Sequence, residues 1–494
     1  MPFRDTALRR HTRYNVDPMT SPSFLWHDFE TFGADPRRDR PSQFAALRTD
    51  SELRPIDEPV VLYCQPADDL LPQPMACLIT GITPQIASER GLPENRFAER
   101  IHELMSQPDT CSVGFNNFRF DDEVTRHLFW RNFFDPYARE YANGNSRFDL
   151  IDVMRMTRAL RPEGIEWANR DDGTPSFRLE DLAAANGLDT SRAHDALADV
   201  EATVELARRV RTHQPRFWDW ALRLRQKHFV ANLLEKRQPL LHSSARFSAR
   251  QCGTAPILPL APHPRFGGQW IVWNLNIDPR LFSGLDGDEL ADRMWTRDED
   301  LPEGIERLPV KLIRSNRCPM ISPMNVLDPQ TARRIEIDPD SIASHAEALA
   351  GDTELIERIR ALFDQDPAGA ADPGDAELAL YAGFVPRSDQ QLYPRIRQLD
   401  GDGLARLGSP FSDPRLNELL FRYRARLYPD SLDEQDQARW QSERRRRLVD
   451  DPDLASIRWP EYRHLVSELM NRQPEQREIL EALARWPEHI GLQA

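Results

Sequence analysis

Cysteine is scarce in this sequence, and the pattern of the few that occur argues against two kinds of stabilising site. The chain has five cysteines, at positions Cys64, Cys77, Cys111, Cys252 and Cys318. Their number is odd, their spacing is wide and no C-x-x-C pair occurs, which argues against a disulfide framework and against a zinc site. Because this usage is typical of a reducing compartment, we predict a cytoplasmic location.

Long apolar segments are absent as well. No apolar run reaches the roughly 18 residues that a membrane-spanning helix requires. The N-terminus carries scattered arginines without the hydrophobic segment of a secretory signal, and residues 1–21 are interpreted as a loose leader. We therefore expect no membrane partner.

Positive charge is also in short supply. The 494 residues carry a net charge of −15, and 40% of them are hydrophobic and 29% charged. This composition is typical of a globular protein, and the length favours about three domains. Since a basic face is the usual footprint of a nucleic-acid-binding protein, the negative charge predicts that any DNA contact is confined to a local groove. We expect the chain to be a monomer.

Residues 22–212 alternate between strand-like and helix-like segments, which predicts an α/β domain. The expected strands are Phe24–Phe29, Val60–Cys64 and Cys111–Gly114. The expected helices are Asn95–Met105, Asp121–Trp130, Leu179–Asn186 and Asp195–Val210. Acids in the first turn of the second helix and a glycine after the third support these assignments.

The pattern of predicted secondary structure changes at about residue 213. Residues 213–366 are interpreted as a small, mostly β domain that begins with a helical segment, Arg216–Leu234, and contains strands at Gln269–Ile277 and Pro309–Arg314. The stretch 364–375 is rich in Asp, Pro, Gly and Ala and predicts a linker, which we place at 367–375.

Residues 376–494 have a helical pattern, clearest at Leu416–Leu427 and Gln435–Leu448. This part of the chain contains a run of four arginines, Arg444–Arg447. Such a run is more often a solvated helix face than a binding site, and we interpret it as solvated.

The first chemical signal is the stretch Leu25–Gly33, an apolar run that contains Asp28 and Glu30. In a strand these two carboxylates project to the same face while Phe29 faces the other way. Two like charges on one buried face are unfavourable unless a cation compensates them. Taken alone, the pair also fits an exposed edge strand with solvated acids.

Further signals lie downstream. Asp121 opens a helix after an asparagine-rich turn, where the alternative is a simple N-cap. His194 and Asp199 are separated by about 140° on a helix, so we expect the histidine in the entering loop and the aspartate on the helix. The stretch 176–182 taken alone is an ordinary helix start.

Together these residues form a set of four acids and a histidine on an α/β chain. Two divalent ions about 3.5–4 Å apart can activate a water and stabilise the leaving oxygen of a phosphodiester. Mg²⁺, or Mn²⁺ in its place, prefers the carboxylate oxygens that four acids supply. A histidine with an ordinary pKa near 6.5 can take the proton of the water at neutral pH.

This pattern resembles the DEDDh exonucleases, which have a ribonuclease H-like fold, and it is closer still to the bacterial exodeoxyribonuclease I family. The motifs that carry the resemblance are H-D-F-E-T-F-G (27–33), R-P-S-Q-F-A-A (40–46), L-I-T-G-I-T-P-Q (78–85), G-F-N-N-F-R-F-D-D-E-V-T-R (114–126), L-R-P-E-G-I (160–165), P-S-F-R-L-E (175–180) and A-H-D-A-L-A-D-V (193–200). The resemblance weakens after residue 212 but continues at 309–319, 380–384 and 421–426, so it spans nearly the whole chain.

The resemblance implies a mixed α/β sheet flanked by helices, followed by a Src-homology-3-like β domain and a helical C-terminal domain that together enclose single-stranded DNA. It implies stepwise 3′→5′ hydrolysis to 5′-mononucleotides, in DNA repair or recombination. It also implies binding to the C-terminal tail of the single-stranded DNA-binding protein, for which the basic residues are hard to place here.

The resemblance also assigns site residues. The two Mg²⁺ ions would be held by Asp28, Glu30, Asp121 and Asp199, with His194 as general base. Glu30 would also touch the substrate, and Leu78–Thr83 would line the pocket for the 3′-terminal nucleotide. The remaining DNA contacts would be Thr125, Arg126, Tyr137, Arg155, Arg178, Lys227, Lys311, Asn316 and Arg317.

The composition around the second motif agrees with a single-stranded substrate. Residues 114–161 contain ten aromatics interleaved with eight arginines. Aromatic faces stack on unpaired bases while arginines follow phosphates, although many of these rings belong to the core. An exoribonuclease, or an enzyme that trims both polymers, is the alternative with the same chemistry, and a non-catalytic single-strand-binding scaffold is a third reading.

Overall fold

The computed structural model describes residues 22–189, 191, 194–364 and 374–492. The leader at 1–21 and most of the expected linker lie outside these residues. Among the described residues, no helix combines the length and the apolar character needed to cross a membrane.

The N-terminal part of the chain is built on a mixed five-stranded sheet with the order β3-β2-β1-β4-β5. Its strands are β1 (Ser23–Thr31), β2 (Pro41–Thr49), β3 (Val60–Tyr63), β4 (Thr110–Gly114) and β5 (Ser146–Asp149). The central strand β1 runs antiparallel to β2 and parallel to β4. The three expected strands are confirmed, whereas β2 and β5 were not predicted.

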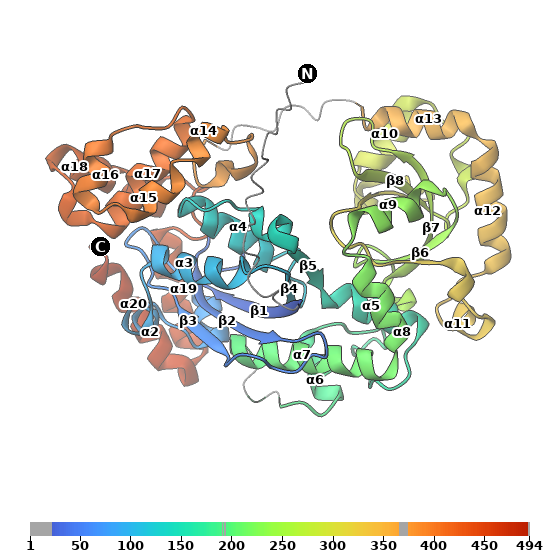
Figure 1. Ribbon diagram of the computed structural model, residues 1–494, viewed down its shortest axis with the longest axis horizontal. Coiled ribbons are helices and arrows are strands. Elements are labelled where there is room, and N and C mark those ends of the chain that lie inside the picture. The colour runs from blue at the N-terminus through green and yellow to red at the C-terminus, as the bar shows by residue number, and fades with distance from the viewer. Residues whose placement is uncertain (1–21, 190, 192–193, 365–373, 493–494) are drawn as a thin grey trace, which may run out of the picture.

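Helices cover both faces of this sheet (Figure 1). They include α3 (Glu94–Met105), α4 (Asp121–Arg131), α5 (Leu150–Leu160), α6 (Leu179–Ala185) and α7 (Ala196–His213). On one face Phe29 and Phe44 pack with Phe97 of α3, and on the other Trp26 belongs to the same cluster as Val200 of α7. Because side chains alternate along β1, residues on the Trp26 face, Asp28 among them, point toward α7.

The middle of the chain forms an antiparallel five-stranded sheet with the order β10-β6-β7-β8-β9. Its strands are β6 (Leu240–Ser243), β7 (Thr254–Pro262), β8 (Gln269–Asn274), β9 (Val310–Arg314) and β10 (Ile321–Pro323). The helices of this part are α8 (Pro215–Arg223), α9 (Lys227–Glu235), α10 (Gly287–Trp295), α11 (Pro329–Arg334), α12 (Pro339–Gly351) and α13 (Thr353–Leu362). The expected helix at 216–234 is therefore two helices.

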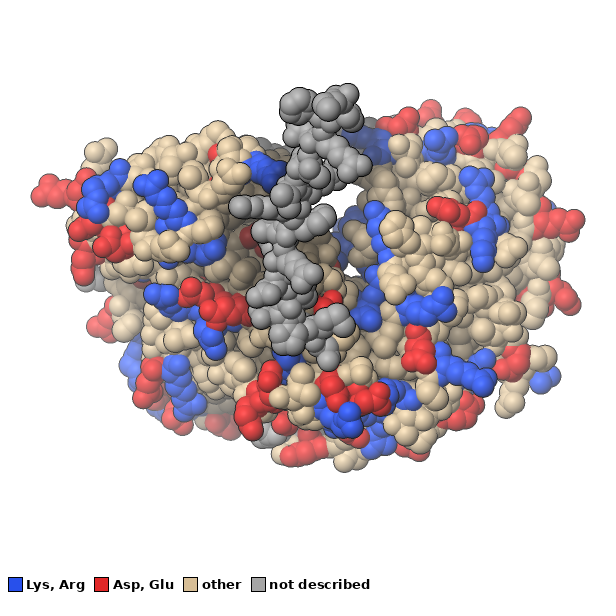
Figure 2. Space-filling model, viewed as in Figure 1, with Lys and Arg blue, Asp and Glu red and all other residues tan. Residues whose placement is uncertain are grey.

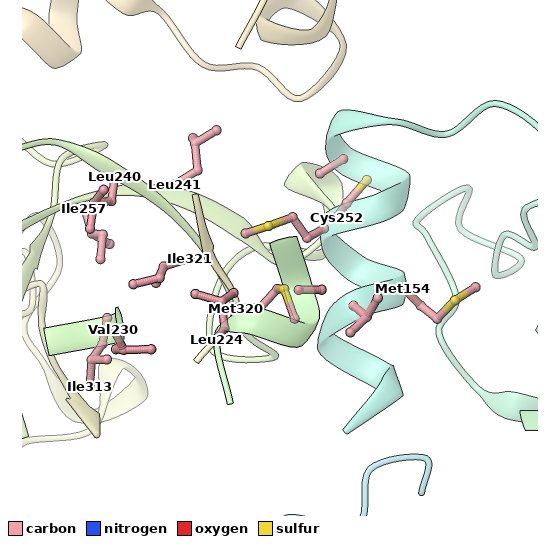
Figure 3. Packing of buried hydrophobic residues seen from close by; sticks show 14 of the residues in the cluster. Met154, Leu224, Val230, Leu240, Leu241, Cys252, Ile257, Ile313, Met320 and Ile321 are labelled. Atoms are coloured by element: carbon pink, nitrogen blue, oxygen red, sulfur yellow. The ribbon is translucent and has the colours of Figure 1, made fainter. Parts of the chain in front are cut away.

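One hydrophobic cluster joins the two sheets. Met154 of α5 and Leu224, just after α8, lie in the same cluster as Leu241, Ile257 and Met320 of the second sheet region. Figure 3 shows Leu224 and Met320 between α5 and the strands, with Met154 on the other side of α5. Burial of large aliphatic side chains contributes roughly 1.5–3 kcal/mol each, so this cluster fixes the position of the second sheet on the first part of the chain.

The remaining residues form the predicted helical C-terminal part. Its helices are α14 (Arg387–Gln390), α15 (Tyr393–Gln398), α16 (Gly401–Leu407), α17 (Pro414–Leu427), α18 (Glu434–Arg445), α19 (Trp459–Arg472) and α20 (Arg477–His489). Two early helices, α1 (Pro74–Thr80) and α2 (Pro84–Arg90), pack against α20, so residues from the two ends of the chain share one core.

The arginine run at the end of α18 corrects a prediction. Arg445 and Arg446 are exposed as expected, but Arg444 and Arg447 are both only 7% exposed. Arg444 donates to Asp68 O at 3.0 Å, and Arg447 contacts Glu377 at 3.1 Å and Asp69 at 3.4 Å. The run is therefore half surface and half core, because successive residues of a helix point in different directions.

Arg447 belongs to a set of buried charges that we call the ionic cluster. Its members are Arg40, Asp69, Glu94, Glu377, Arg426 and Arg447. Arg40 contacts Glu377 and Glu94 at 3.0 Å each, and Arg426 contacts Asp69 at 2.6 Å and Glu377 at 2.5 Å. The cluster joins the first and last parts of the chain.

Candidate active site

Three carboxylates converge where β1 meets α7. Asp28 and Glu30 project from alternate positions of β1, and Asp199 lies in the first turn of α7. One oxygen from each lies within 4.8 Å of one from each of the others. The strand holds two ligands on one face and the helix supplies the third, as the spacing of the motifs predicts.

Asp121 completes the acidic group from the start of α4. It is 3% exposed, and its Oδ1 accepts a hydrogen bond from the backbone N–H of Phe29 at 3.1 Å. The N-cap position of α4 is occupied by Phe120, so the alternative that Asp121 is only a cap is wrong. Its carboxylate is instead tied to the backbone between Asp28 and Glu30.

The electrostatics of the four acids are those of uncompensated like charges. Burial, followed by the neighbouring carboxylates, raises the pKa of Glu30 to about 8 and holds the pKa of Asp28 well above its usual value. Burial also raises the pKa of Asp121 to about 7 and that of Asp199 to about 6, and His194 opposes the rise at Asp199.

These pKa values mean that the ionised group is unfavourable without a cation. Carboxylate oxygens gathered this closely are the ligand set that hard divalent cations prefer. The residues present therefore fit a divalent metal site.

His194 lies in the loop that enters α7, as predicted, and Asp195 caps the helix. The backbone of His194 has a positive φ of 66°, and the His194 side chain is 45% exposed. Its Nε2 lies 3.6 Å from Oε2 of Glu180 in the first turn of α6, and Arg178 pairs with the other oxygen of Glu180. Sequence reasoning gave Glu180 no role, although the R-L-E motif contains it.

The predicted DNA contacts on α4 are held inside the protein. Thr125 is fully buried and donates to Asp121 O at 2.8 Å. Arg126 is 3% exposed, pairs with Glu123 at 2.5 Å and Glu140 at 2.8 Å, and lies over the ring of Tyr137 at 5.5 Å. These geometries assign both side chains to fixing α4, and their direct contact with DNA stays a prediction.

The other predicted contacts are more accessible. The Arg178 side chain is 67% exposed, and Arg155 lies over Phe177 at 5.5 Å while pairing with Asp152 at 2.5 Å. In the second sheet region, Lys227 and Asn316 are exposed.

Two further contacts from the second sheet region are partly buried. Lys311 Nζ lies 2.7 Å from Nε2 of His242, and burial lowers the pKa of Lys311 to about 7. Burial, followed by the charge of the Arg126 guanidinium, lowers the pKa of Arg317. Figure 2 shows a hollow on this face with Lys and Arg side chains along the wall that the second sheet region forms.

The expected nucleotide pocket lies at the end of α1. Gly81 is the C-cap residue of α1 and has a φ of 70°, and Ile82 and Thr83 are 6% and 4% exposed. Ile79 is 53% exposed, and the role of this segment in binding a nucleotide stays a prediction.

Comparison with known proteins assigns relatives to all three parts of the chain. Three family models match this chain. The model described as Exonuclease matches residues 25–207, the model described as Exonuclease I SH3-like domain matches residues 225–365, and the model described as Exonuclease I C-terminal domain matches residues 374–490. Exodeoxyribonuclease I of Escherichia coli (strain K12) is 44% identical over 471 residues, which cover 95% of this chain and 98% of that protein.

Two solved structures are similar over nearly the whole chain. E. coli Exonuclease I in complex with a dA16 oligonucleotide has a TM-score of 0.90 and 43% identity, and it covers 95% of this chain and 100% of the other. An ExoI/SSB-Ct complex has a TM-score of 0.87 and 42% identity with the same coverage. The likeness therefore includes the second sheet and the C-terminal helices as well as the carboxylate site.

Proposed function

The chain belongs to the exodeoxyribonuclease I family and is an exonuclease with single-stranded DNA as its substrate; from this premise we propose that it releases 5′-mononucleotides stepwise from the 3′ end. The observation that carries the proposal is the convergence of Asp28, Glu30 and Asp199, with Asp121 bonded to the strand between the first two. Asp121 is buried and Asp28, Glu30 and Asp199 are half-buried, and four such acids with raised pKa values form a site that needs cations to ionise.

In the proposed mechanism Asp28, Glu30, Asp121 and Asp199 would hold two Mg²⁺ ions, or Mn²⁺ in their place. When bound, the ions would neutralise the charge of the scissile phosphate and stabilise the leaving oxygen. His194 accepts the proton of the attacking water, for which its exposed position before α7 leaves room. Glu180 orients the His194 ring, and Arg178 in turn holds Glu180.

We propose a division of labour along the chain. Residues 22–212 carry the chemistry, while residues 213–366 and 376–494 enclose the strand on either side of the hollow in Figure 2. Lys227, Lys311, Asn316 and Arg317 contribute from the second sheet region. This arrangement accounts for DNA binding by a chain of net charge −15, because the basic side chains line a local groove.

We also propose that the chain binds the C-terminal tail of the single-stranded DNA-binding protein, because a similar structure is a complex with that tail. A fluorescent tail peptide titrated into the protein should bind at micromolar concentrations. A peptide with its acidic residues replaced by amides is the control, and the absence of binding at micromolar levels would reject the partnership.

Digestion of 5′-labelled oligonucleotides tests the activity in one experiment. With Mg²⁺ present, single-stranded DNA should shorten progressively to a ladder, and chelation should stop the reaction. Duplex DNA and a matched RNA strand should persist. Rapid loss of the RNA would favour the exoribonuclease alternative, and release of the 5′ label as a mononucleotide at the start would reverse the proposed polarity.

A further inference from the structure

A buried histidine of the second sheet region holds the amine of Lys311. His242 lies on β6 and is 4% exposed, and its Nδ1 lies 2.9 Å from the carbonyl oxygen of Met320. Because a carbonyl oxygen only accepts, Nδ1 carries the ring proton and Nε2 is left as an acceptor. The amine of Lys311, 2.7 Å away, therefore donates to Nε2. Burial, followed by the charge of Lys311, holds the pKa of His242 well below its usual value, so the ring stays neutral.

Lys311 and His242 come from strands that are not neighbours. Lys311 lies on β9 and His242 on β6, and the strands β7 and β8 separate them in the sheet order. The ring of Phe247 lies on the same amine, with its centroid 4.8 Å from Nζ, and packs edge to face with the His242 ring at 5.6 Å. The position of the amine is therefore fixed by two rings that carry no charge.

The charges that act on the Lys311 amine are mostly positive. Burial is the main reason that the pKa of Lys311 falls to about 7, and the guanidinium groups of Arg246, Arg119 and Arg155 lower it further. Asp152 acts in the opposite direction, but its carboxylate pairs with Arg155 at 2.5 Å. The amine therefore lies among cations, and the acid nearest in influence already has a partner.

These cations converge from two parts of the chain. Arg119 belongs to the turn before α4 and Arg155 to α5, whereas Lys311 lies on β9 and Arg246 follows β6. Their meeting point is the junction between the first sheet and the second. A phosphodiester carries one negative charge throughout the neutral pH range, so a phosphate bound at this junction would offset the repulsion among the cations and favour the charged form of the amine.

We propose that Lys311 takes up a proton from the solvent when a backbone phosphate of the single strand binds beside it, and that His242 is the positioning residue that holds the amine for this contact. The proposal rests on the proposed function and adds a proton linkage to the binding step. The amine nitrogen gains one N–H bond, a water or buffer acid loses that proton, and no other bond changes. Binding should therefore be tightest below about pH 7, where Lys311 is already charged, and weaken as the pH rises.

The first test measures binding without hydrolysis. Labelled dA20 is titrated by fluorescence anisotropy in EDTA between about pH 6.5 and pH 8.5, a range in which its bases and phosphates do not titrate. Because ionisation of the acids in the candidate active site also weakens binding as the pH rises, the wild-type protein is compared with Lys311→Met. Over this range the wild-type Kd should rise about tenfold more than the Kd of Lys311→Met.

A matched control removes another lysine of the same region. Lys227 is exposed, and its contact with DNA is predicted as that of Lys311 is. Lys227→Met should weaken binding by a similar factor at each pH, because loss of a solvated charge removes a phosphate contact without changing the proton linkage.

The second test counts protons. Calorimetric titration of dA20 at about pH 8, in two buffers of different ionisation enthalpy, should show that the wild-type protein takes up about one proton more per complex than Lys311→Met. Lys311→Arg, whose guanidinium is always charged, should lack this proton uptake as well. His242→Gln keeps a donor for the Met320 carbonyl and an acceptor for Lys311, so it should retain the uptake. His242→Phe has neither group and should bind the strand several-fold more weakly at about pH 6.5.

The outcomes separate this inference from the function on which it rests. Equal proton uptake by the wild-type protein and Lys311→Met, or a parallel pH dependence of their Kd values, would overturn the proposal. Wild-type affinity of His242→Phe at about pH 6.5 would overturn the positioning role of His242. Failure of the wild-type protein to release nucleotides with Mg²⁺ would instead reject the proposed function, because neither binding measurement depends on catalysis.

Discussion

The carboxylates of the candidate active site and those of the ionic cluster are all buried or half-buried, yet their pKa values shift in opposite directions. In the active site the pKa of Glu30 is raised to about 8, because burial and neighbouring acids both disfavour its charge. In the ionic cluster the pKa of Glu94 is lowered to about 2, because Arg131 and Arg40 outweigh the same burial. Burial is common to both groups, and the difference is whether the protein supplies the counter-charge.

This comparison distinguishes a binding site from a structural joint. The ionic cluster neutralises itself with Arg40, Arg426 and Arg447, so it has no need of a ligand. The four acids at β1, α4 and α7 have no guanidinium among the main causes of their shifts, so their neutralisation must come from protons or from bound cations. The unfavourable charge is what gives this site its affinity for metal.

The largest expected effect is on catalysis. Asp199→Asn keeps the size of the side chain but removes one charge from the metal-ligand set. Because metal ions supply several kcal/mol of transition-state stabilisation, nucleotide release should fall by about 10³-fold or more. Release from single-stranded DNA is measured with binding in EDTA as the companion assay, and binding should survive. Asp172→Asn, on an exposed turn, is the matched control, and undiminished nucleolysis by Asp199→Asn would refute the site.

The next effect is on folding. Glu377→Gln removes the carboxylate that Arg40, Arg426 and Arg447 share, and it leaves the three guanidinium groups with Asp69 as the only carboxylate of the ionic cluster that all three still contact. Breaking a buried pair in this way typically costs about 3–5 kcal/mol. Urea denaturation followed by circular dichroism should show the loss.

The control for Glu377→Gln is Glu461→Gln, which removes the partner of Arg458 at the surface. This change should alter the free energy of unfolding by less than about 1 kcal/mol. If the two variants were equally stable, the ionic cluster would not be a structural joint.

The third prediction concerns pH and metal. The folded pKa values of Glu30, Asp121 and Asp199 lie at about 8, 7 and 6, above the unfolded values near 4. For acids with raised pKa, the folded state binds protons more tightly, so their stabilising contribution is complete below about pH 4 and is lost as pH rises to about 8.

The Tm of the metal-free protein should therefore fall from pH 5.5 to 8 by about 2–6 °C more than that of Glu30→Gln. Mg²⁺ should raise Tm more at pH 8 than at pH 6, since binding needs ionised carboxylates. If the difference in Tm between the wild-type protein and Glu30→Gln stayed constant from pH 5.5 to 8, the assignment of the raised pKa values would be contradicted.

The sequence predicted the positions of the candidate site residues better than it predicted the scaffold, for physical reasons. The period of a strand places Asp28 and Glu30 on one face, and the period of a helix places His194 off the helix, so local geometry sufficed. The strand β2 is buried at all nine positions, and without an alternating pattern it could not be recognised as a strand.

The ionic cluster could not be predicted at all from the sequence. Its contact between Arg40 and Glu377 joins residues 337 positions apart, and no local pattern carries such information. Glu180 was missed for the same reason, because only the folded chain brings it to His194. The alternative that Asp121 is an N-cap failed because Phe120 occupies the N-cap position of α4, although its side chain cannot cap the helix.

The smallest expected effect separates neighbours within one arginine run. Arg445 is 72% exposed and lies 3.5 Å from Asp450, which is itself 51% exposed, so water screens this pair. Arg445→Ala should change the free energy of unfolding by no more than about 0.5 kcal/mol. Arg447→Ala, two residues along the same run, removes a buried partner of Glu377 and Asp69 and should cost several times as much, about 3 kcal/mol. Parallel urea titrations of the two variants measure the difference, and equal losses would mean that burial does not separate the two halves of the run.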